Sequence, residues 1–124
     1  MRERIYRKGD VFLTDFGVPH GSEQGGKRPV VIVQNDDGLF SAPTVTMVPM
    51  TTILKKRYQK THYLLKHSDC VRYPSMVEAE QVHTIDKNRV IRKLGRLDKR
   101  ALARVEEALR NHFGFDIPDD IEAP

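Results

Sequence analysis

The sequence predicts a mainly β protein with one α-helix: a small antiparallel sheet, curled or closed into a barrel, followed by a C-terminal helix. Three observations lead to this expectation. Short segments rich in β-forming residues recur between turn residues, no helical period separates them, and the apolar spacing becomes helical only after residue 98. The first two argue against a parallel α/β fold. With 124 residues and 14.3 kDa, the chain has the size of a single domain.

The first half of the chain contains three predicted strands. In residues 8–16, Val11 and Leu13 alternate with Asp10, Phe12 and Thr14, which predicts a strand with both faces partly covered. Residues 29–35 form a buried apolar strand that can begin with a proline. Residues 44–50 form the third strand, in which Pro49 indicates an edge or a bulge. A glycine-rich segment separates the first two strands, and a turn at residues 36–38 separates the next two.

The second half begins with a basic stretch, residues 51–60, which has no apolar period and is predicted to be a loop. Residues 61–66 and 75–83 are two further short strands, separated by turn-like residues. After a connection at residues 86–88, residues 89–97 form the last predicted strand.

A helix over residues 99–113 is the clearest element of the sequence. Leu102, Val105, Leu109 and Phe113 fall on one stripe. Asp98 is the expected N-cap, Leu97 is spaced to pack on Leu102, and Gly114 is the expected stop. The remaining residues, 116–124, are acidic, contain two prolines and are expected to fray.

Composition narrows the classes of function. One cysteine, Cys70, allows no internal disulfide, and no apolar run approaches the length of a membrane span, so we expect a cytoplasmic protein. The net charge is +4, but the four acidic residues after Gly114 have no basic neighbours. Residues 1–113 therefore carry all 21 basic side chains against 13 of the 17 acidic ones. A body this basic attracts polyanions, nucleic acid first among them.

The stretch "GSEQGGKRP" combines backbone freedom with Arg28 at the entrance of a strand. A P-loop would require Gly-Lys-Ser/Thr before a helix, and a dinucleotide fingerprint also opens a helix, so both are excluded. Two interpretations remain from the residues alone. The loop could be a mobile lid that brings Arg28 to a phosphodiester, or a connection whose Arg28 pairs with a carboxylate.

A longer stretch, "GDVFLTDFGVPHGSEQGGKRPVVIVQND", resembles the N-terminal signature of the MazF toxin family, also called PemK or Kid. The similarity continues through "PTVTMVPMT", "THYLL" and "EQVHTIDKNRVIRKLGRLD", spans residues 7–109, and is greater to the Gram-positive type. The resemblance implies an SH3-like antiparallel β-barrel of the CcdB/PemK kind with a C-terminal helix, assembled as a homodimer. It places the toxin domain at residues 1–115 and the acidic tail at 116–124.

The same resemblance implies an activity. Members of the family are ribosome-independent mRNA interferases of type II toxin–antitoxin systems, which cleave single-stranded RNA at a short sequence without a metal. The products are a 2′,3′-cyclic phosphate and a 5′-hydroxyl, and the implied partner is a MazE-like antitoxin whose acidic segment competes with RNA. The catalytic residues that the resemblance implies are Arg28, Thr51 and Ser22.

These residue types suit the reaction. A guanidinium can give two parallel hydrogen bonds to phosphate oxygens, and neutral donors such as Thr51 and Ser22 add to the stabilisation of developing charge. The general base is not assigned: Glu23 and His20 are candidates in the glycine loop, and both could equally be solvated. His62 and His83 would suit a two-histidine mechanism, but nothing in the sequence brings them together.

The expected RNA surface is basic and partly aromatic. Lys55, Lys56, Arg57 and Lys60 would contact phosphates, and the bases need stacking or edge contacts. The candidates for RNA binding are Phe16, His20, Glu23, Gln24, Lys55, Lys56, Arg57, Tyr58, Gln81 and His83. His83 stands where other Gram-positive members often carry arginine. No spacing of Cys and His fits a zinc site, so we expect no metal and no cofactor.

Two other classes of function stay open at this point. A CcdB-like toxin would share the fold and poison DNA gyrase without cleaving RNA, but such proteins depend on a C-terminal tryptophan, and this chain has no tryptophan. A basic nucleic-acid binder without catalytic activity is the other alternative. Cleavage of single-stranded RNA into fragments with cyclic-phosphate ends distinguishes all three.

Overall fold

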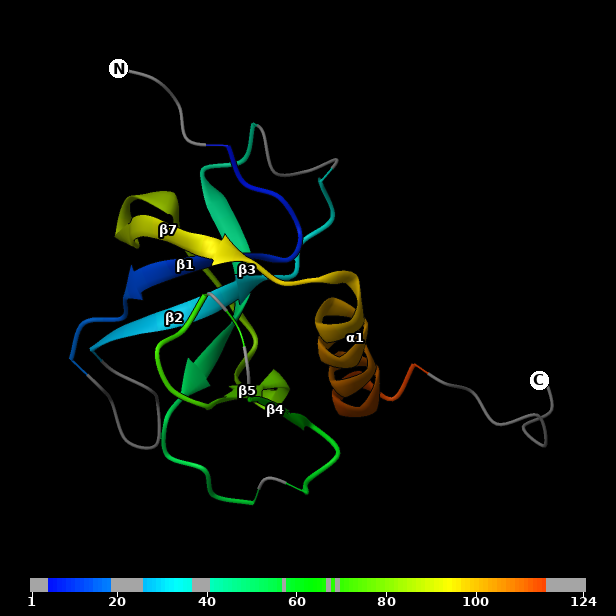
Figure 1. Cartoon of the computed structure of the whole chain (residues 1–124). Coiled ribbons are helices and arrows are strands. Elements are labelled where there is room, and N and C mark those ends of the chain that lie inside the picture. Colours follow the sequence, from blue (N-terminus) through cyan, green and yellow to red (C-terminus); the bar gives the residue numbers. More distant parts are fainter. Residues whose placement is uncertain are drawn as a thin grey trace, which may run out of the picture.

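The computed structural model describes residues 5–18, 26–36, 41–56, 58–66, 68 and 70–115. One sheet and one long helix dominate these residues (Figure 1). The elements, in chain order, are β1 (Asp10–Asp15), β2 (Lys27–Ile32), β3 (Thr44–Thr51), β4 (His62–Leu65), β5 (Ser75–Glu78), the 3₁₀ turn η2 (Ala79–Gln81), β6 (His83–Asp86), the 3₁₀ turn η3 (Lys87–Arg89), β7 (Val90–Arg96) and α1 (Lys99–Phe113). The mainly β fold with a C-terminal helix is confirmed.

The strands are antiparallel and follow the order β4-β5-β3-β2-β1-β7, with β6 also paired to β3. Strand β3 is therefore the centre of the sheet. It pairs with β2 along one edge, and along the other edge it pairs first with β6 and then with β5. Its last two residues, Met50 and Thr51, belong to the ladder with β5.

The expected single strand over residues 75–83 is wrong, because it is broken into β5, η2 and the start of β6. Both strands pair with β3: Val77 faces Met50, and His83 faces Met47. Three steps along β3 separate Met50 from Met47, whereas six steps separate Val77 from His83, and the three extra residues form η2. The predicted strand is thus broken because β5 and β6 both pair with β3.

Strand β2 also differs from its expected bounds, since it runs from Lys27 to Ile32 rather than over residues 29–35. It begins early because Lys27 and Arg28 pair with the end of β1. It ends early because the side chain of Gln34 takes over the pairing, with its Oε1 accepting a hydrogen bond from the Thr46 amide at 3.0 Å.

The two faces of the sheet carry different cores. On one face Val11, Val31, Val48 and Val77 are fully buried in the cluster that also contains Ala101 and Val105 of α1. On the other face a smaller cluster of Phe12, Phe16, Val30, Ile32, Val45, Met47 and Val90 packs without the helix. Figure 1 shows α1 on one side of the sheet only. The second face therefore buries its apolar side chains without a contribution from α1.

The helix begins and ends as expected. The Asp98 side chain accepts a hydrogen bond from the Ala101 amide at 2.8 Å, Leu97 is buried, and Gly114 adopts the left-handed conformation with φ of 69°. Among the described residues, no helix has the length and apolar character needed to cross a membrane.

Gly95 of β7 allows a close approach between β7 and the segment before β5. A Cβ atom at Gly95 would lie 2.8 Å from the Sγ of buried Cys70, and φ at this glycine is 157°. The β1–β7 register shifts beside it, between Val11 and Phe12. Only a residue without a side chain fits here unless Cys70 moves.

Candidate active site

Arg28 and Thr51 come from neighbouring strands and meet at the same end of the sheet. Arg28 pairs with Thr14 of β1, and β2 pairs with β3 through Val30 and Pro49. When that register is continued by two residues, Arg28 comes level with Thr51. Alternate residues of a strand share a face, so both side chains lie on the face of Val30, away from α1.

The Thr51 side chain is fixed by one hydrogen bond, and its hydroxyl group can still donate another. Its side chain is buried, with 9% of the residue exposed, and its Oγ1 accepts a hydrogen bond from the Ile53 amide at 3.1 Å. A hydroxyl that accepts one hydrogen bond can still donate its own proton. Arg28 is half-buried beside the fully buried Thr14. A cation and a hydroxyl donor are thus available together at this end of the sheet.

Phe16 and His83 lie on the same face as Arg28 and Thr51. Their rings meet edge to face with centroids 5.2 Å apart, and His83 pairs with Met47 of β3. His83 Nδ1 lies 3.1 Å from the Gln81 carbonyl oxygen, which can only accept, so Nδ1 carries the hydrogen. Phe16 is buried whereas His83 is exposed. The His83 ring is therefore exposed, and the buried Phe16 ring packs against it.

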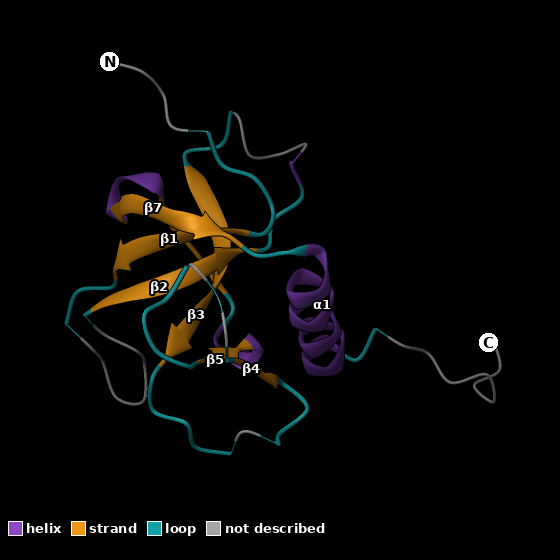
Figure 2. Cartoon of the chain, viewed as in Figure 1, coloured by secondary structure: helices purple, strands orange, loops and turns teal. Residues whose placement is uncertain are grey.

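The basic loop, residues 52–61, projects beyond the end of β3 before the chain returns to β4 (Figure 2). Lys55 and Lys56 are exposed, and Tyr58 has 87% of its surface exposed. Ile53 is also exposed, at 58%. Lys56 has φ of 53°, and no other described non-glycine residue has a positive φ. The predicted phosphate contacts and a stacking ring are thus presented outward on one loop.

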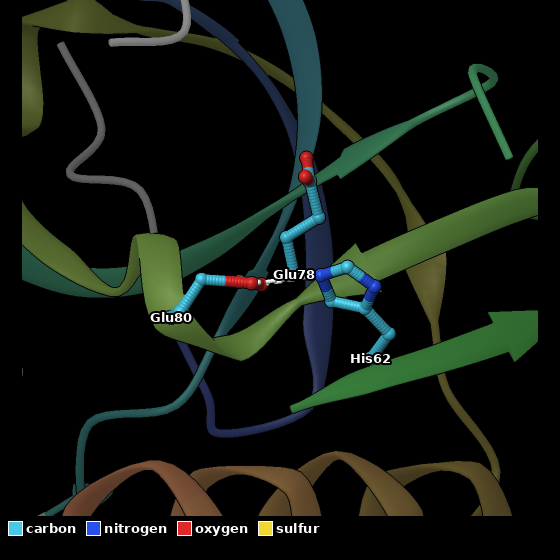
Figure 3. A group of neighbouring side chains, drawn as sticks. All are labelled: His62, Glu78 and Glu80. Atoms are coloured by element: carbon cyan, nitrogen blue, oxygen red, sulfur yellow. Dashed lines mark hydrogen bonds and ion pairs between the residues drawn. The ribbon is translucent and has the colours of Figure 1, made fainter. Parts of the chain in front are cut away.

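A cluster that sequence reasoning did not find lies beside this loop: His62 of β4, Glu78 of β5 and Glu80 of η2 (Figure 3). One ligand-type atom from each lies within 4.8 Å of the others. His62 Nε2 is 2.6 Å from Oε1 and 2.8 Å from Oε2 of Glu80, and the His62 side chain is only 7% exposed. The sequence suggested His62 only as half of a histidine pair with His83.

The same distances decide between a metal and a proton in this cluster. Two ligands of one zinc, magnesium or calcium ion stand about 3 Å or more apart, given their bond lengths and angles. His62 Nε2 and the Glu80 oxygens are closer than this, at 2.6 and 2.8 Å. The spacing matches a charge-assisted hydrogen bond instead.

Five candidate residues lie outside the described part of the chain: Ser22, His20, Glu23, Gln24 and Arg57. The ends of the glycine loop are described, and they are joined. The Phe16 amide donates to the Gly26 carbonyl at 2.9 Å, and the Gly26 amide donates to the Gly17 carbonyl at 2.7 Å. These two hydrogen bonds lie close to Arg28 in the chain, so the loop begins and ends at the candidate site.

Known proteins resemble this chain in sequence and in fold. A family model described as "PemK-like, MazF-like toxin of type II toxin-antitoxin system" matches residues 7–113. The chain is 40% identical over 112 residues to Endoribonuclease MazF of Staphylococcus saprophyticus, covering 90% of this chain and 93% of that relative. It is 38% identical over 110 residues to Endoribonuclease EndoA of Bacillus subtilis, covering 86% and 92%.

Solved structures share the fold. MazF (Form-I) from Deinococcus radiodurans superimposes with a TM-score of 0.79 and 21% identity, over 91% of this chain and all of that chain. A mycobacterial endoribonuclease in complex with its cognate antitoxin gives a TM-score of 0.76 and 24% identity, over 91% and 99%. At these identities the likeness concerns the fold alone.

Proposed function

The chain belongs to the PemK-like, MazF-like toxin family of type II toxin–antitoxin systems, and we propose that it is an endoribonuclease that cleaves single-stranded RNA at a short sequence. The observation that supports this proposal is the pairing of β2 with β3, whose register, when continued by two residues, brings Arg28 level with Thr51 on the sheet face away from α1. Among the relatives described above, the Gram-positive proteins MazF and EndoA have the highest sequence identity, at 40% and 38%.

The reaction forms one bond and breaks another. The 2′-oxygen attacks the adjacent phosphorus, its proton passes to a base, and the P–O5′ bond breaks as the 5′-oxygen receives a proton. The products are a 2′,3′-cyclic phosphate and a 5′-hydroxyl. Negative charge develops on the non-bridging oxygens, so a fixed donor aimed at them lowers the barrier.

Arg28 supplies charge rather than a proton in this scheme. A guanidinium remains protonated in proteins, and its planar fork can make two parallel hydrogen bonds to phosphate oxygens. Thr51 and Ser22 each add a neutral hydroxyl donor. The base stays a prediction, with Glu23 and His20 as candidates. His62 is a poor one, because its Nε2 is already engaged by Glu80 within a side chain that is 7% exposed.

The RNA would lie across the exposed ends of this face. Lys55, Lys56 and Tyr58 are exposed on the basic loop, and exposed His83 stands on the other side of the face beside Gln81. Phosphate contacts by lysine weaken with added salt, while bases splayed from a single strand need stacking and edge contacts. The arrangement offers both kinds of contact around Arg28 and Thr51.

The protein would act in the cytoplasm, as a homodimer, and would be restrained by a MazE-like antitoxin. The solved mycobacterial relative was crystallised with its cognate antitoxin. An acidic antitoxin segment would occupy the same basic surface as RNA and compete with it. No metal takes part in the proposed mechanism, since Arg28 supplies the charge that a metal would otherwise provide.

The test is incubation of the purified protein with a long single-stranded RNA in excess chelator, followed by mapping of fragment ends. Fragments with cyclic-phosphate ends at a short shared sequence are the expected result. Binding without cleavage would favour a non-catalytic RNA binder instead. Inhibition of DNA gyrase by intact protein that leaves RNA uncut would favour the gyrase-poisoning class. An Arg28→Ala variant is the control for contaminating nuclease.

A further inference from the structure

His62 is bonded at both ring nitrogens, and its protonation follows from its partners. Nδ1 lies 2.9 Å from the Lys56 carbonyl oxygen, which can only accept, so Nδ1 carries a hydrogen. Nε2 faces the Glu80 carboxyl group at 2.6 and 2.8 Å, a contact that requires another proton between them. The ring therefore donates to the Lys56 carbonyl oxygen and shares a proton with the Glu80 carboxyl group.

The first of these bonds holds a strained point of the basic loop. Lys56 has a positive φ of 53°, a conformation that is strained for a residue with a side chain and persists only where its surroundings enforce it. The Lys56 carbonyl oxygen accepts from two groups, the Gln59 amide at 2.9 Å and His62 Nδ1 at 2.9 Å. His62 is thus one of two donors that fix the loop at its exposed lysines.

The second bond ties the loop to η2. Glu80 belongs to η2, and its Oε2 also lies 3.4 Å from Thr61 Oγ1 at the end of the loop. The Ala79 amide donates to the Thr61 carbonyl at 2.9 Å. Immediately after Glu80, Gln81 holds His83 through its carbonyl group. His62 therefore links the two sides of the candidate RNA surface, the basic loop and the segment that carries His83.

We propose that His62 is a positioning residue, whose ring is hydrogen-bonded at both nitrogens and holds the basic loop and η2 in the arrangement that binds RNA. The link to RNA binding rests on the proposed function, whereas the two hydrogen bonds of His62 do not depend on it. His62 lies opposite Glu78 in the β4–β5 ladder. The charged groups around the ring are Glu80, Glu78 and, lining the adjoining hollow between β4 and α1, Lys60, Arg104 and Glu107.

Two substitutions separate the two bonds. In His62→Asn the amide nitrogen takes the place of Nδ1 and can donate to the Lys56 carbonyl, but it does not reach Glu80. In His62→Gln the amide nitrogen takes the place of Nε2 and reaches Glu80 only. If the loop bond positions the RNA surface, the asparagine variant keeps the KM for RNA, whereas the glutamine variant raises it about three- to tenfold, the loss expected for one or two phosphate contacts. The kcat of both stays within about twofold.

Glu80→Gln tests the shared proton with the loop left in place. Its amide can donate to the lone pair of a neutral His62 while Nδ1–H stays on the Lys56 carbonyl. This variant keeps the loop bond and is therefore expected to bind RNA with the wild-type KM. Glu78→Gln removes the same charge nearby and is the matched control, also expected to leave the KM unchanged.

The decisive measurement needs no RNA. Nitrogen-15 spectra of the histidine rings are expected to show a hydrogen on Nδ1 of His62, and the backbone amides of Lys56 and Tyr58 are expected to shift in His62→Gln and not in His62→Asn. Thermal unfolding of each variant confirms that it is folded. A lone pair on Nδ1, or unmoved loop amides in His62→Gln, would each overturn the proposal. If the wild type cleaves no RNA, the proposed function fails, while these spectra still decide the positioning claim.

Discussion

Replacing Arg28 by lysine tests the proposed chemistry most directly, because it keeps the charge and changes the geometry. Arg28 sits on a paired strand, with Thr14 opposite it in β1 and Thr51 level with it in the continued register of β3. A lysine in this position would still attract the phosphate, but an ammonium group cannot make two parallel hydrogen bonds to it. The variant therefore loses one of two aligned donors.

The expected loss of cleavage rate follows from the loss of one of the two donors. Removing one preorganised donor aimed at developing charge costs about 2.7–4 kcal/mol, so the cleavage rate of Arg28→Lys should fall about 10²–10³-fold. The KM should change by less than about threefold, because the number of phosphate charges that the protein neutralises stays the same. Arg28→Ala should lose both the rate and part of the affinity.

The assay is single-turnover cleavage of a labelled RNA at saturating protein, which isolates the chemical step. Lys27→Gln is the matched control: Lys27 is the adjacent exposed cation, and its side chain lies on the opposite face of β2. It should leave the rate unchanged. A single-turnover rate for Arg28→Lys within about threefold of the wild type would refute the two-bond role of the guanidinium.

Three further predictions concern Thr51, the helix cap and the close approach at Gly95. Thr51→Ala should lower the single-turnover rate about 10²-fold, while Thr51→Ser keeps the hydroxyl and most of the rate. Asp98→Ala removes the acceptor of the Ala101 amide and should cost about 1 kcal/mol, seen as a melting point lower by a few degrees in circular dichroism. Gly95→Ala should destabilise by about 1–3 kcal/mol in urea unfolding, because its Cβ would lie 2.8 Å from Cys70 Sγ. Cys70→Ala should restore part of this loss, and additive effects of the two changes would contradict the clash.

The helix could be predicted to the residue because every signal for it is local. The apolar stripe, the Asp98 cap and the left-handed Gly114 act within one or two turns. The break at η2 could not be predicted in this way. Residues 78–81, Glu-Ala-Glu-Gln, are weak strand formers, but the place of the break follows from the pairing of the flanking residues with two different parts of β3.

The candidate site shows the same contrast between local signals and contacts made by strand pairing. Arg28 and Thr51 were expected from a resemblance to a family, and the residues alone left open whether Arg28 binds a phosphate or a carboxylate. The structure adds that the two strands bring them level. His62 and Glu80 are 18 positions apart with no motif between them, so only the pairing of β4 with β5 reveals their contact.

Strand β3 changes partners between Pro49 and Met50, and this has a mechanical consequence. Pro49 is the last β3 residue paired with β2, and Thr51 belongs to the ladder with β5, whereas Arg28 belongs to the ladder with β1. The separation of Arg28 and Thr51 is therefore sensitive to the bend of β3 beyond Pro49.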